Sequence, residues 1–261
     1  MKADLKDITF LILVRLDSVE RLENIIMAAN DLVNHFETNV CVLEAANYCN
    51  GILKKMLNKK IKYSFVEDKD PVLHKTQYYN RMTKEINSPF LAIWDTDIVL
   101  DKNAITLAVE HLRSGKAEMA LPYNGICMEV PDVIRAFYIK KRNIKTLYRH
   151  QNKMERLYHK LVVGGAVFFN KEKFLEIGMD NEKHYGWGND DYDRFYRAKN
   201  HGLKIYNTDN CLFHLWHPRG TNSRFRSDTQ LHISSDELLK IENSSKEDIT
   251  KTFHHYYAYI Q

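Results

Sequence analysis

Apolar positions in the first hundred residues alternate between two spacings, one typical of buried strands and one of amphipathic helices. Apolar runs rich in β-branched and aromatic residues predict strands at 7–14, 39–44, 61–66 and 90–94. Helical spacing predicts a helix after the candidate N-caps Asp17 and Ser18, and two more at 48–57 and 74–86. Repeated strand and helix units predict an α/β fold with a mostly parallel central sheet flanked by helices, in which ligands bind beyond the carboxyl ends of the strands.

The second half of the chain is less regular. Its spacing predicts a helix at 103–112, a strand at 117–121, and a long amphipathic helix from Ile134 to about residue 161. A strand at 161–170, helices at 171–177 and 191–199, and a strand pair within 204–216 follow. Residues 230–261 read as two polar helices that end in the aromatic segment 254–259.

Composition narrows the class of protein. The net charge is only +4, and 44% of the 261 residues are hydrophobic, so the chain can bury a sizeable core and is not disordered. No apolar run approaches the roughly 20 residues of a membrane span, and the N-terminus lacks the apolar stretch of a secretory leader. The four cysteines show no CxxC spacing. We therefore expect a cytoplasmic, reduced protein.

Basic residues gather in one segment, with nine Lys or Arg between Arg135 and Lys160 and a single acid, Glu155. A solvated helix face is the plain interpretation. The alternative is contact with an anionic substrate or with anionic lipid head groups at a membrane surface. Nucleic acid is not expected as a partner, because the basicity is local and no nucleic-acid-binding motif accompanies it.

The most informative acids, Asp95 and Asp97, follow the strand at 90–94. Two carboxylates at i and i+2 on an extended chain point to the same side, and at an apolar strand end they are costly unless a cation binds them. Oxygen ligands suit Mg²⁺ or Mn²⁺, which would in turn bind a diphosphate. A helix cap is the alternative reading of such a pair.

A second cluster begins with Trp187 between two glycines and continues into Asp190 and Asp191. The glycines permit a tight loop, and the indole offers a flat apolar face to a sugar ring. One of the two acids can cap the following helix. The other is a candidate general base, because neighbouring carboxylate and indole groups can raise its proton affinity.

A third cluster contains His214, His217 and Arg219. Strand alternation would turn the two histidines to opposite faces unless Pro218 bends the chain. Core or surface histidines without a ligand are the plain alternative. If the two converge, they can supply imidazole to a metal and Arg219 a cation to a phosphate, and mixed nitrogen and oxygen ligation favours Mn²⁺ over Mg²⁺.

In this order, the three clusters resemble nucleotide-sugar-dependent glycosyltransferases of the GT-A fold. The resemblance is to the β-1,4-galactosyltransferases, the polypeptide N-acetylgalactosaminyltransferases and the bacterial chondroitin polymerases, over roughly residues 5–225. Its most specific part is Gly164, Gly165 and Ala166, followed by the string WGNDDYD from Trp187. It implies one GT-A domain at 1–225, with a nucleotide-sugar half at 1–100, an acceptor half at 101–225, and a helical tail at 226–261.

The resemblance also implies roles for individual residues. Asp97 and His217 would bind the metal, with Asp95 as a partner near the ribose or the metal and His214 as a second histidine ligand. Asp191 would be the catalytic base. The acceptor sugar would meet Trp187, Gly188, Gly165 and Asp190, the last standing where the family usually has Glu.

Residues 14–22 also resemble the family's first strand-to-helix turn. This resemblance predicts the residues on the nucleotide-sugar side of the site. It implies that Arg15 approaches the uridine or its phosphates and that Glu44 approaches the base or the ribose; Lys75 and Arg219 would also face the donor. Surface ion pairs with Asp17 or Glu20 are the alternative for the arginines of this turn, and a solvated loop position is the alternative for Glu44.

The expected function is metal-dependent, inverting transfer of a sugar of galactose or N-acetylhexosamine type from a UDP-sugar to a glycan hydroxyl. The acceptor would be a glycan or lipid-linked glycan of a bacterial surface polysaccharide, with possible peripheral contact to the inner face of an anionic membrane. One alternative is a haloacid-dehalogenase-like phosphatase, which residues 95–100 superficially resemble. Another is a carbohydrate-binding protein without catalysis.

Overall fold

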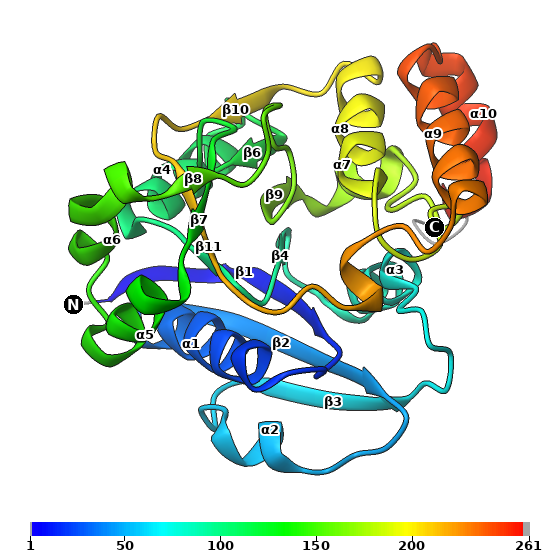
Figure 1. The fold of residues 1–261 in the computed structure, drawn as a ribbon. Coiled ribbons are helices and arrows are strands. Elements are labelled where there is room, and N and C mark those ends of the chain that lie inside the picture. The colour runs from blue at the N-terminus through cyan, green and yellow to red at the C-terminus, as the bar shows by residue number, and fades with distance from the viewer. Residues whose placement is uncertain (1, 258–261) are drawn as a thin grey trace.

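A seven-stranded sheet forms the centre of the computed structural model, which describes residues 2–257, with side chains through Phe253 (Figure 1). Its strand order is β10-β6-β9-β4-β1-β2-β3, and only β9 runs antiparallel to its neighbours. The strands are β1 (Ala3–Val14), β2 (Phe36–Ala46), β3 (Lys62–Glu67), β4 (Phe90–Trp94), β6 (Met119–Leu121), β9 (Ala166–Asn170) and β10 (Ile205–Asn207). This is the mostly parallel sheet that the sequence predicts.

Helices flank the sheet because each presents an apolar face to it. In α1 (Val19–His35) the N-cap is Ser18, whose hydroxyl accepts from the amide of Arg21, and the buried face includes Ile25, Ala29 and Leu32. This helix packs on β1 and β2, while α3 (Lys75–Glu85) packs on β1 and α4 (Lys102–Arg113) packs on β6 and β9. The short helices α2 (Ile52–Met56) and α7 (Lys171–Glu176) complete this part of the fold.

A second, smaller sheet stands over the carboxyl ends of β1 and β4. Its order is β5-β11-β7-β8, from β5 (Ile98–Val99), β11 (Leu212–Leu215), β7 (Cys127–Val130) and β8 (Glu155–Arg156). The amide of Leu215 donates to the carbonyl of Asp97 at 2.7 Å, so a strand from late in the chain is joined to the segment after β4. The predicted strand pair at 204–216 is therefore wrong as a pair, because β10 joins the large sheet and β11 the small one.

The long helix predicted at 134–161 is also wrong. The segment instead forms α5 (Asp132–Lys141), α6 (Lys145–His150), the short 3-10 turn η1 (Gln151–Lys153) and β8. Helix α5 ends because Arg142 adopts a left-handed conformation, with φ of 51°, and β8 then pairs with β7. The basic run is not one face, because Arg135 is buried and pairs with Glu23 at 2.7 Å.

Two other boundaries move because a glycine has positive φ. The helix expected at 48–57 begins only after Gly51, with φ of 71°, and the strand expected at 161–170 begins only after Gly165, with φ of 83°. The segment before Gly165 is left as a loop beside the sheet end.

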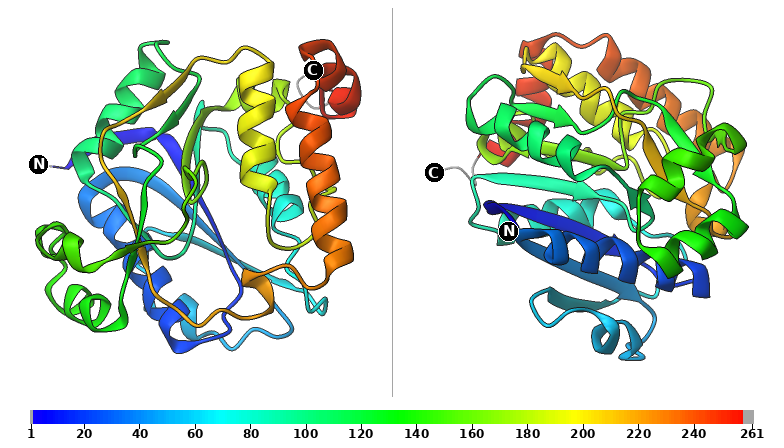
Figure 2. Two further views of the ribbon diagram at one scale, coloured as in Figure 1. Left: turned by 45° about the horizontal axis from the view of Figure 1, so that its top comes forward. Right: turned by 90° about the vertical axis from the view of Figure 1, so that its left-hand side faces the viewer.

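The C-terminal helices α9 (Asp228–Glu242) and α10 (Lys246–Tyr257) pack against the rest of the fold. Figure 2 shows α9 beside α8 (Asp190–Asn200). Ile241, Ile249 and Phe253 are buried in the main core. The aromatic segment 254–259 lies outside the side chains that the structure describes. Within residues 2–257, no helix combines the length and the apolar character that crossing a membrane requires.

Candidate active site

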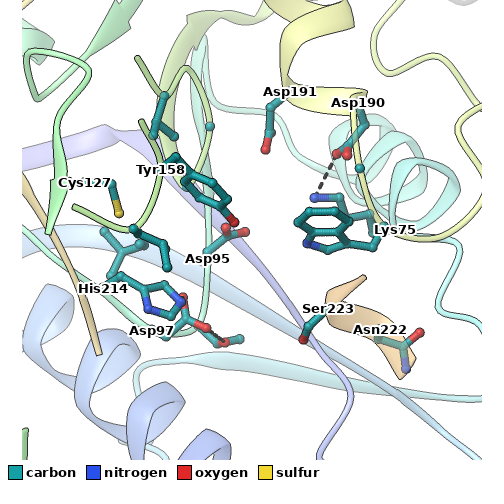
Figure 3. Close-up of a pocket in the computed structure, with 18 of the residues that line it drawn as sticks. Lys75, Asp95, Asp97, Cys127, Tyr158, Asp190, Asp191, His214, Asn222 and Ser223 are labelled. Atoms are coloured by element: carbon teal, nitrogen blue, oxygen red, sulfur yellow. Dashed lines mark hydrogen bonds and ion pairs between the residues drawn. The ribbon is translucent and has the colours of Figure 1, made fainter. Parts of the chain in front are cut away.

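One cavity of about 390 Å³ lies at the carboxyl ends of β1 and β4, under the small sheet and beside the start of α8 (Figure 3). Its walls come from both halves of the chain. Nearly every site residue expected from the sequence lines it: Lys75, Asp95, Asp97, Gly165, Trp187, Gly188, Asp190, Asp191, His214, His217 and Arg219. The position agrees with the rule that ligands of such sheets bind beyond the strand ends.

Asp97 and both histidines converge at one end of this cavity. The Nε2 atom of His217 lies 3.2 Å from Oδ2 of Asp97, and Nε2 of His214 lies 3.6 Å from Oδ1. The three residues are buried, and one potential ligand atom from each lies within 4.8 Å of the others. Strand alternation does not separate the histidines, because β11 ends at Leu215 and His217 lies beyond the strand.

Outer contacts fix the two imidazoles. Nδ1 of His217 lies 2.8 Å from the carbonyl oxygen of Pro218 and 3.2 Å from Nη2 of Arg21, while Nε2 faces Asp97. Nδ1 of His214 lies 2.9 Å from Oε2 of Glu129, although the two atoms are not aligned for a hydrogen bond. A carboxylate or carbonyl behind a histidine is the usual arrangement around a protein metal ion. One carboxylate and two imidazoles form a set of metal ligands that fits a divalent cation such as Mn²⁺.

Charges at this end keep Asp97 ionised. Burial alone would raise the pKa of this carboxyl, but His214, His217 and the guanidinium of Arg21 hold it well below its usual range. The Asp95 carboxyl behaves differently, because burial raises its pKa to about 7 despite the charge of Lys75. Asp95 lines the cavity but does not belong to the group formed by Asp97 and the two histidines.

Two adjacent carboxylates of α8 face the cavity with different partners. Asp190 is buried and pairs with the ammonium of Lys75 at 2.8 Å, as the dashed line in Figure 3 marks. Asp191 keeps about 30% of its side chain exposed and accepts from Nη1 of Arg194 at 2.8 Å. Arg194 is itself buried and bound to Asp180 at 2.6 Å.

The expectation of a raised proton affinity is wrong for Asp191. Burial works in that direction, but Lys75 and Arg194 outweigh it and lower the pKa of Asp191. The pKa that burial raises is that of Asp190. Neither acid caps the helix, because the N-cap residue is Asn189, with φ of 66°, and the two acids occupy the first turn.

The loop before α8 carries Trp187 into the cavity. Gly186 and Gly188, with φ of 89° and 107°, make the tight turns that this loop requires. The indole meets the ring of Phe225 edge to face, at 5.4 Å between ring centroids. Phe225 belongs to the segment after the 3-10 turn η2 (Thr221–Ser223), and nothing in the sequence pattern singled it out.

Gly164 brings backbone directly against the Asp191 carboxylate. A Cβ atom on Gly164 would lie 2.0 Å from Oδ2 of Asp191, which is shorter than any allowed contact. The carbonyl of Gly165 accepts from the amide of Asp95 at 2.7 Å. The absence of a side chain at Gly164 therefore lets this segment lie against the first turn of α8, while Gly165 is bonded to the segment after β4.

Arg15 and Glu44 are not among the residues that line the cavity. Arg15 donates to the carbonyl of Ala45 at 2.9 Å and pairs closely with Asp68. Glu44 is buried and accepts from the phenol of Tyr63 at 2.7 Å, so it is not a solvated loop acid.

Arg21 lines the cavity instead, although the turn motif had favoured Arg15. Its guanidinium lies 2.8 Å from Asp17 and 3.7 Å from Asp97. The expected surface pairing with Asp17 therefore exists, and the same side chain also reaches the group formed by Asp97 and the histidines. The predicted helix already indicated that Arg21 could reach the cavity, because position 21 falls in the first turn of α1, next to the end of the preceding strand. Arg194 had no comparable marker in the sequence.

Comparison with known proteins gives two matches. The family model described as "N-terminal domain of galactosyltransferase" matches residues 146–218, a segment that contains the glycine pair, Trp187, Asp190, Asp191 and both histidines. The mannosyltransferase PcManGT from Pyrobaculum calidifontis, solved with GDP-Man and Mn²⁺, superimposes with a TM-score of 0.53 at 14% sequence identity, over 97% of this chain and 69% of that one. No curated protein sequence matches the chain. The chain therefore has the fold of a GT-A nucleotide-sugar glycosyltransferase, and residues 146–218, which build part of its cavity, are similar to the galactosyltransferase family.

Proposed function

We propose that this protein is a metal-dependent, inverting glycosyltransferase that uses a UDP-sugar of galactose or N-acetylhexosamine type. The observation that carries the proposal is the meeting of Asp97, His214 and His217 in the same cavity as Trp187 and Asp191. A cation site and a partly exposed carboxylate in one cavity suit a metal-dependent transfer from a nucleotide-sugar to a hydroxyl.

The donor would lie with its diphosphate at Asp97, His214 and His217. A divalent cation bound there would neutralise charge on the departing diphosphate, a contribution of several kcal/mol in metal-dependent enzymes. Arg21 and Arg219 would supply further positive charge to the phosphate oxygens. The distance from Arg219 to Glu129 is 4.0 Å, at the limit of an ion pair.

The acceptor sugar would stack on Trp187 with its hydroxyl toward Asp191. Asp191 takes the hydroxyl proton as a new bond forms between the acceptor oxygen and the anomeric carbon. The bond from that carbon to the diphosphate oxygen breaks on the opposite face, and the electron pair leaves with the nucleotide. Arg194 keeps Asp191 ionised and aimed into the cavity. Asp190 forms an ion pair with Lys75, so we assign Asp190 to binding of the acceptor sugar and not to proton transfer.

The identity of the donor nucleotide needs its own test. PcManGT is a mannosyltransferase solved with GDP-Man, which makes a guanosine donor the direct competitor of a uridine donor. A thermal-shift panel of UDP, GDP and their sugar conjugates, each with and without Mn²⁺, separates the two. A shift that requires both Mn²⁺ and UDP or a UDP-sugar supports the proposal. A shift with Mn²⁺ and GDP alone would overturn the uridine donor, and no shift with any pair would overturn the proposal as a whole.

The two alternative functions predict other results. A haloacid-dehalogenase-like phosphatase would release phosphate from a generic phosphomonoester, and a binding protein would retain a glycan without consuming any nucleotide-sugar. The phosphatase has less support because its aspartate pair normally follows the first strand of the core, whereas Asp95 and Asp97 follow β4.

For the cellular role, we propose synthesis of a bacterial surface polysaccharide on a glycan or lipid-linked acceptor in the cytoplasm. Peripheral contact with an anionic membrane would use the exposed part of α5, where Val133 and Phe137 neighbour Lys140 and Lys141. Flotation with anionic liposomes at low and high salt tests this contact, and equal recovery with neutral liposomes would contradict it.

A further inference from the structure

One face of α9 is bonded to the loop that carries Trp187. The side-chain amide of Gln230 donates to the carbonyl of Tyr185 at 2.7 Å, and the hydroxyl of Ser234 donates to the carbonyl of Gly188 at 3.2 Å. One turn further, the Glu237 carboxylate accepts from Asn181 at 3.0 Å. These three helix residues are spaced by four and three positions, so they lie on the same face of α9. The loop is therefore attached to α9 at both of its ends and in its middle.

A buried chain of polar side chains continues from this face into α8. Ser234 lies 3.1 Å from Nδ1 of His184, and Nε2 of His184 lies 2.9 Å from Asp193. Ser, His and Asp are the residue types of a hydrolase triad, but all three are buried and the serine proton is directed to the Gly188 carbonyl. These contacting polar side chains connect α9, through the loop, to α8, the helix that bears Asp191.

The loop also has little free space around it. A Cβ atom on Gly186 would lie 2.8 Å from Val72 and 2.9 Å from Gln230, and one on Gly188 would lie 2.4 Å from Phe225. The position of the indole is therefore set by the elements around the loop. Asp97 and the two histidines are held by other elements, namely the segment after β4, β11 and the turn after it.

We propose that Gln230 and Ser234 are positioning residues for the acceptor sugar, acting through the loop that carries Trp187. This inference rests on the proposed transferase function. Loss of either hydrogen bond loosens the loop and misplaces the indole, while the donor end of the cavity keeps its geometry. The expected signature is a selective rise in the acceptor KM, with donor affinity unchanged.

The experiment compares Gln230→Ala and Ser234→Ala with the wild type and with Asp236→Asn, a control on the exposed face of α9. Hydrogen exchange of the peptide covering 181–189 is measured first. We expect about fivefold faster exchange in both alanine variants, since one hydrogen bond is typically worth about 1 kcal/mol, and wild-type exchange in the control. Exchange at wild-type rates in both alanine variants would overturn the inference.

Kinetics then separate positioning from general damage. We expect the acceptor KM to rise about tenfold, while the Kd for nucleotide with Mn²⁺ and the rate of donor hydrolysis in water stay within about twofold. Ser234→Thr keeps the hydroxyl and should restore the exchange rate. An equal loss of donor and acceptor binding would contradict the proposal. If Ser234→Ala does not fold, Gln230→Ala carries the test, because Gln230 is only half-buried.

Failure of the inference is distinguishable from failure of the proposed function. A wild type that consumes no nucleotide-sugar removes the transferase proposal and with it the acceptor role of these residues, while the exchange data still report whether α9 holds the loop. A wild type that transfers sugar while Gln230→Ala and Ser234→Ala match it in acceptor KM keeps the function and removes the inference.

Discussion

The imidazole of His217 lies 3.2 Å from the carboxylate of Asp97, although one follows β11 and the other follows β4. Two segments far apart in the sequence thus meet at the end of the central sheet. The hydrogen bond from the Leu215 amide to the Asp97 carbonyl sets this meeting, because it fixes β11 beside the segment after β4.

Replacing Asp97 should remove metal-dependent donor binding. We expect Asp97→Ala to lose the Mn²⁺-dependent part of nucleotide affinity, because the carboxylate is the only anionic member of the cluster with His214 and His217. Calorimetric titration of nucleotide with and without Mn²⁺ measures this difference. Unchanged affinity in the presence of Mn²⁺ would remove Asp97 from the metal site.

Replacing Asp191 should affect chemistry and not donor binding. Asp191→Asn keeps the size of the side chain but cannot accept the acceptor proton, so we expect kcat to fall about 10²- to 10⁴-fold. The nucleotide Kd should stay close to the wild-type value. Turnover at the wild-type rate would show that another group accepts the proton.

A methyl group at Gly164 should act through Asp191. The added Cβ would fall 2.0 Å from Oδ2 of Asp191, so Gly164→Ala must displace the carboxylate or the loop. We expect a loss of transfer comparable to that of Asp191→Asn. Gly220→Ala is a matched control, because its Cβ would meet Asp17 at an ordinary 3.4 Å. Equal activity of both alanine variants would mean that the close contact has no catalytic role.

Two arginines near the first turn of α1 should behave differently. Arg21→Met removes a cation from the cavity, and we expect nucleotide affinity to fall about tenfold, which corresponds to about 1.4 kcal/mol. Arg15→Met should instead lower the melting temperature, because Arg15 binds Asp68 and the Ala45 carbonyl. Parallel calorimetry and thermal unfolding of both variants give the comparison. A larger loss of affinity in Arg15→Met would reverse the assignment.

The buried network around Asp193 predicts acid sensitivity. Burial opposes ionisation, but Arg197 and His184 lower the pKa of Asp193 to about 2, from an ordinary value of 3.8. The stabilisation by the ionised form is therefore complete above about pH 4 and is lost as the pH falls through 2. It corresponds to about 2 kcal/mol. Denaturant unfolding between pH 2 and 5 should show a flatter pH dependence in Asp193→Asn, and an equal slope would contradict this.

The pattern of apolar residues along the chain was enough to predict the central sheet and the helices that flank it. The buried runs of β1 and β4 and the apolar face of α1 leave few other ways to shield those side chains from water, so strand and helix alternation predicts the parallel sheet. The candidate residues around Asp97, Trp187 and His217 could also be named in advance, because charged and glycine-flanked groups at strand ends are unusual.

The sequence by itself determined which residue types could bind a cation, a phosphate and a sugar. Tertiary structure decided which of them meet: Arg21 and not Arg15 reaches the cavity, and Arg194 keeps Asp191 ionised where its neighbours had suggested the opposite. It also decided that residues 134–161 bend into short elements instead of one helix. The physical reason is that periodicity reports burial along one segment, whereas pKa values and shared ligands depend on distances between segments that only packing brings together.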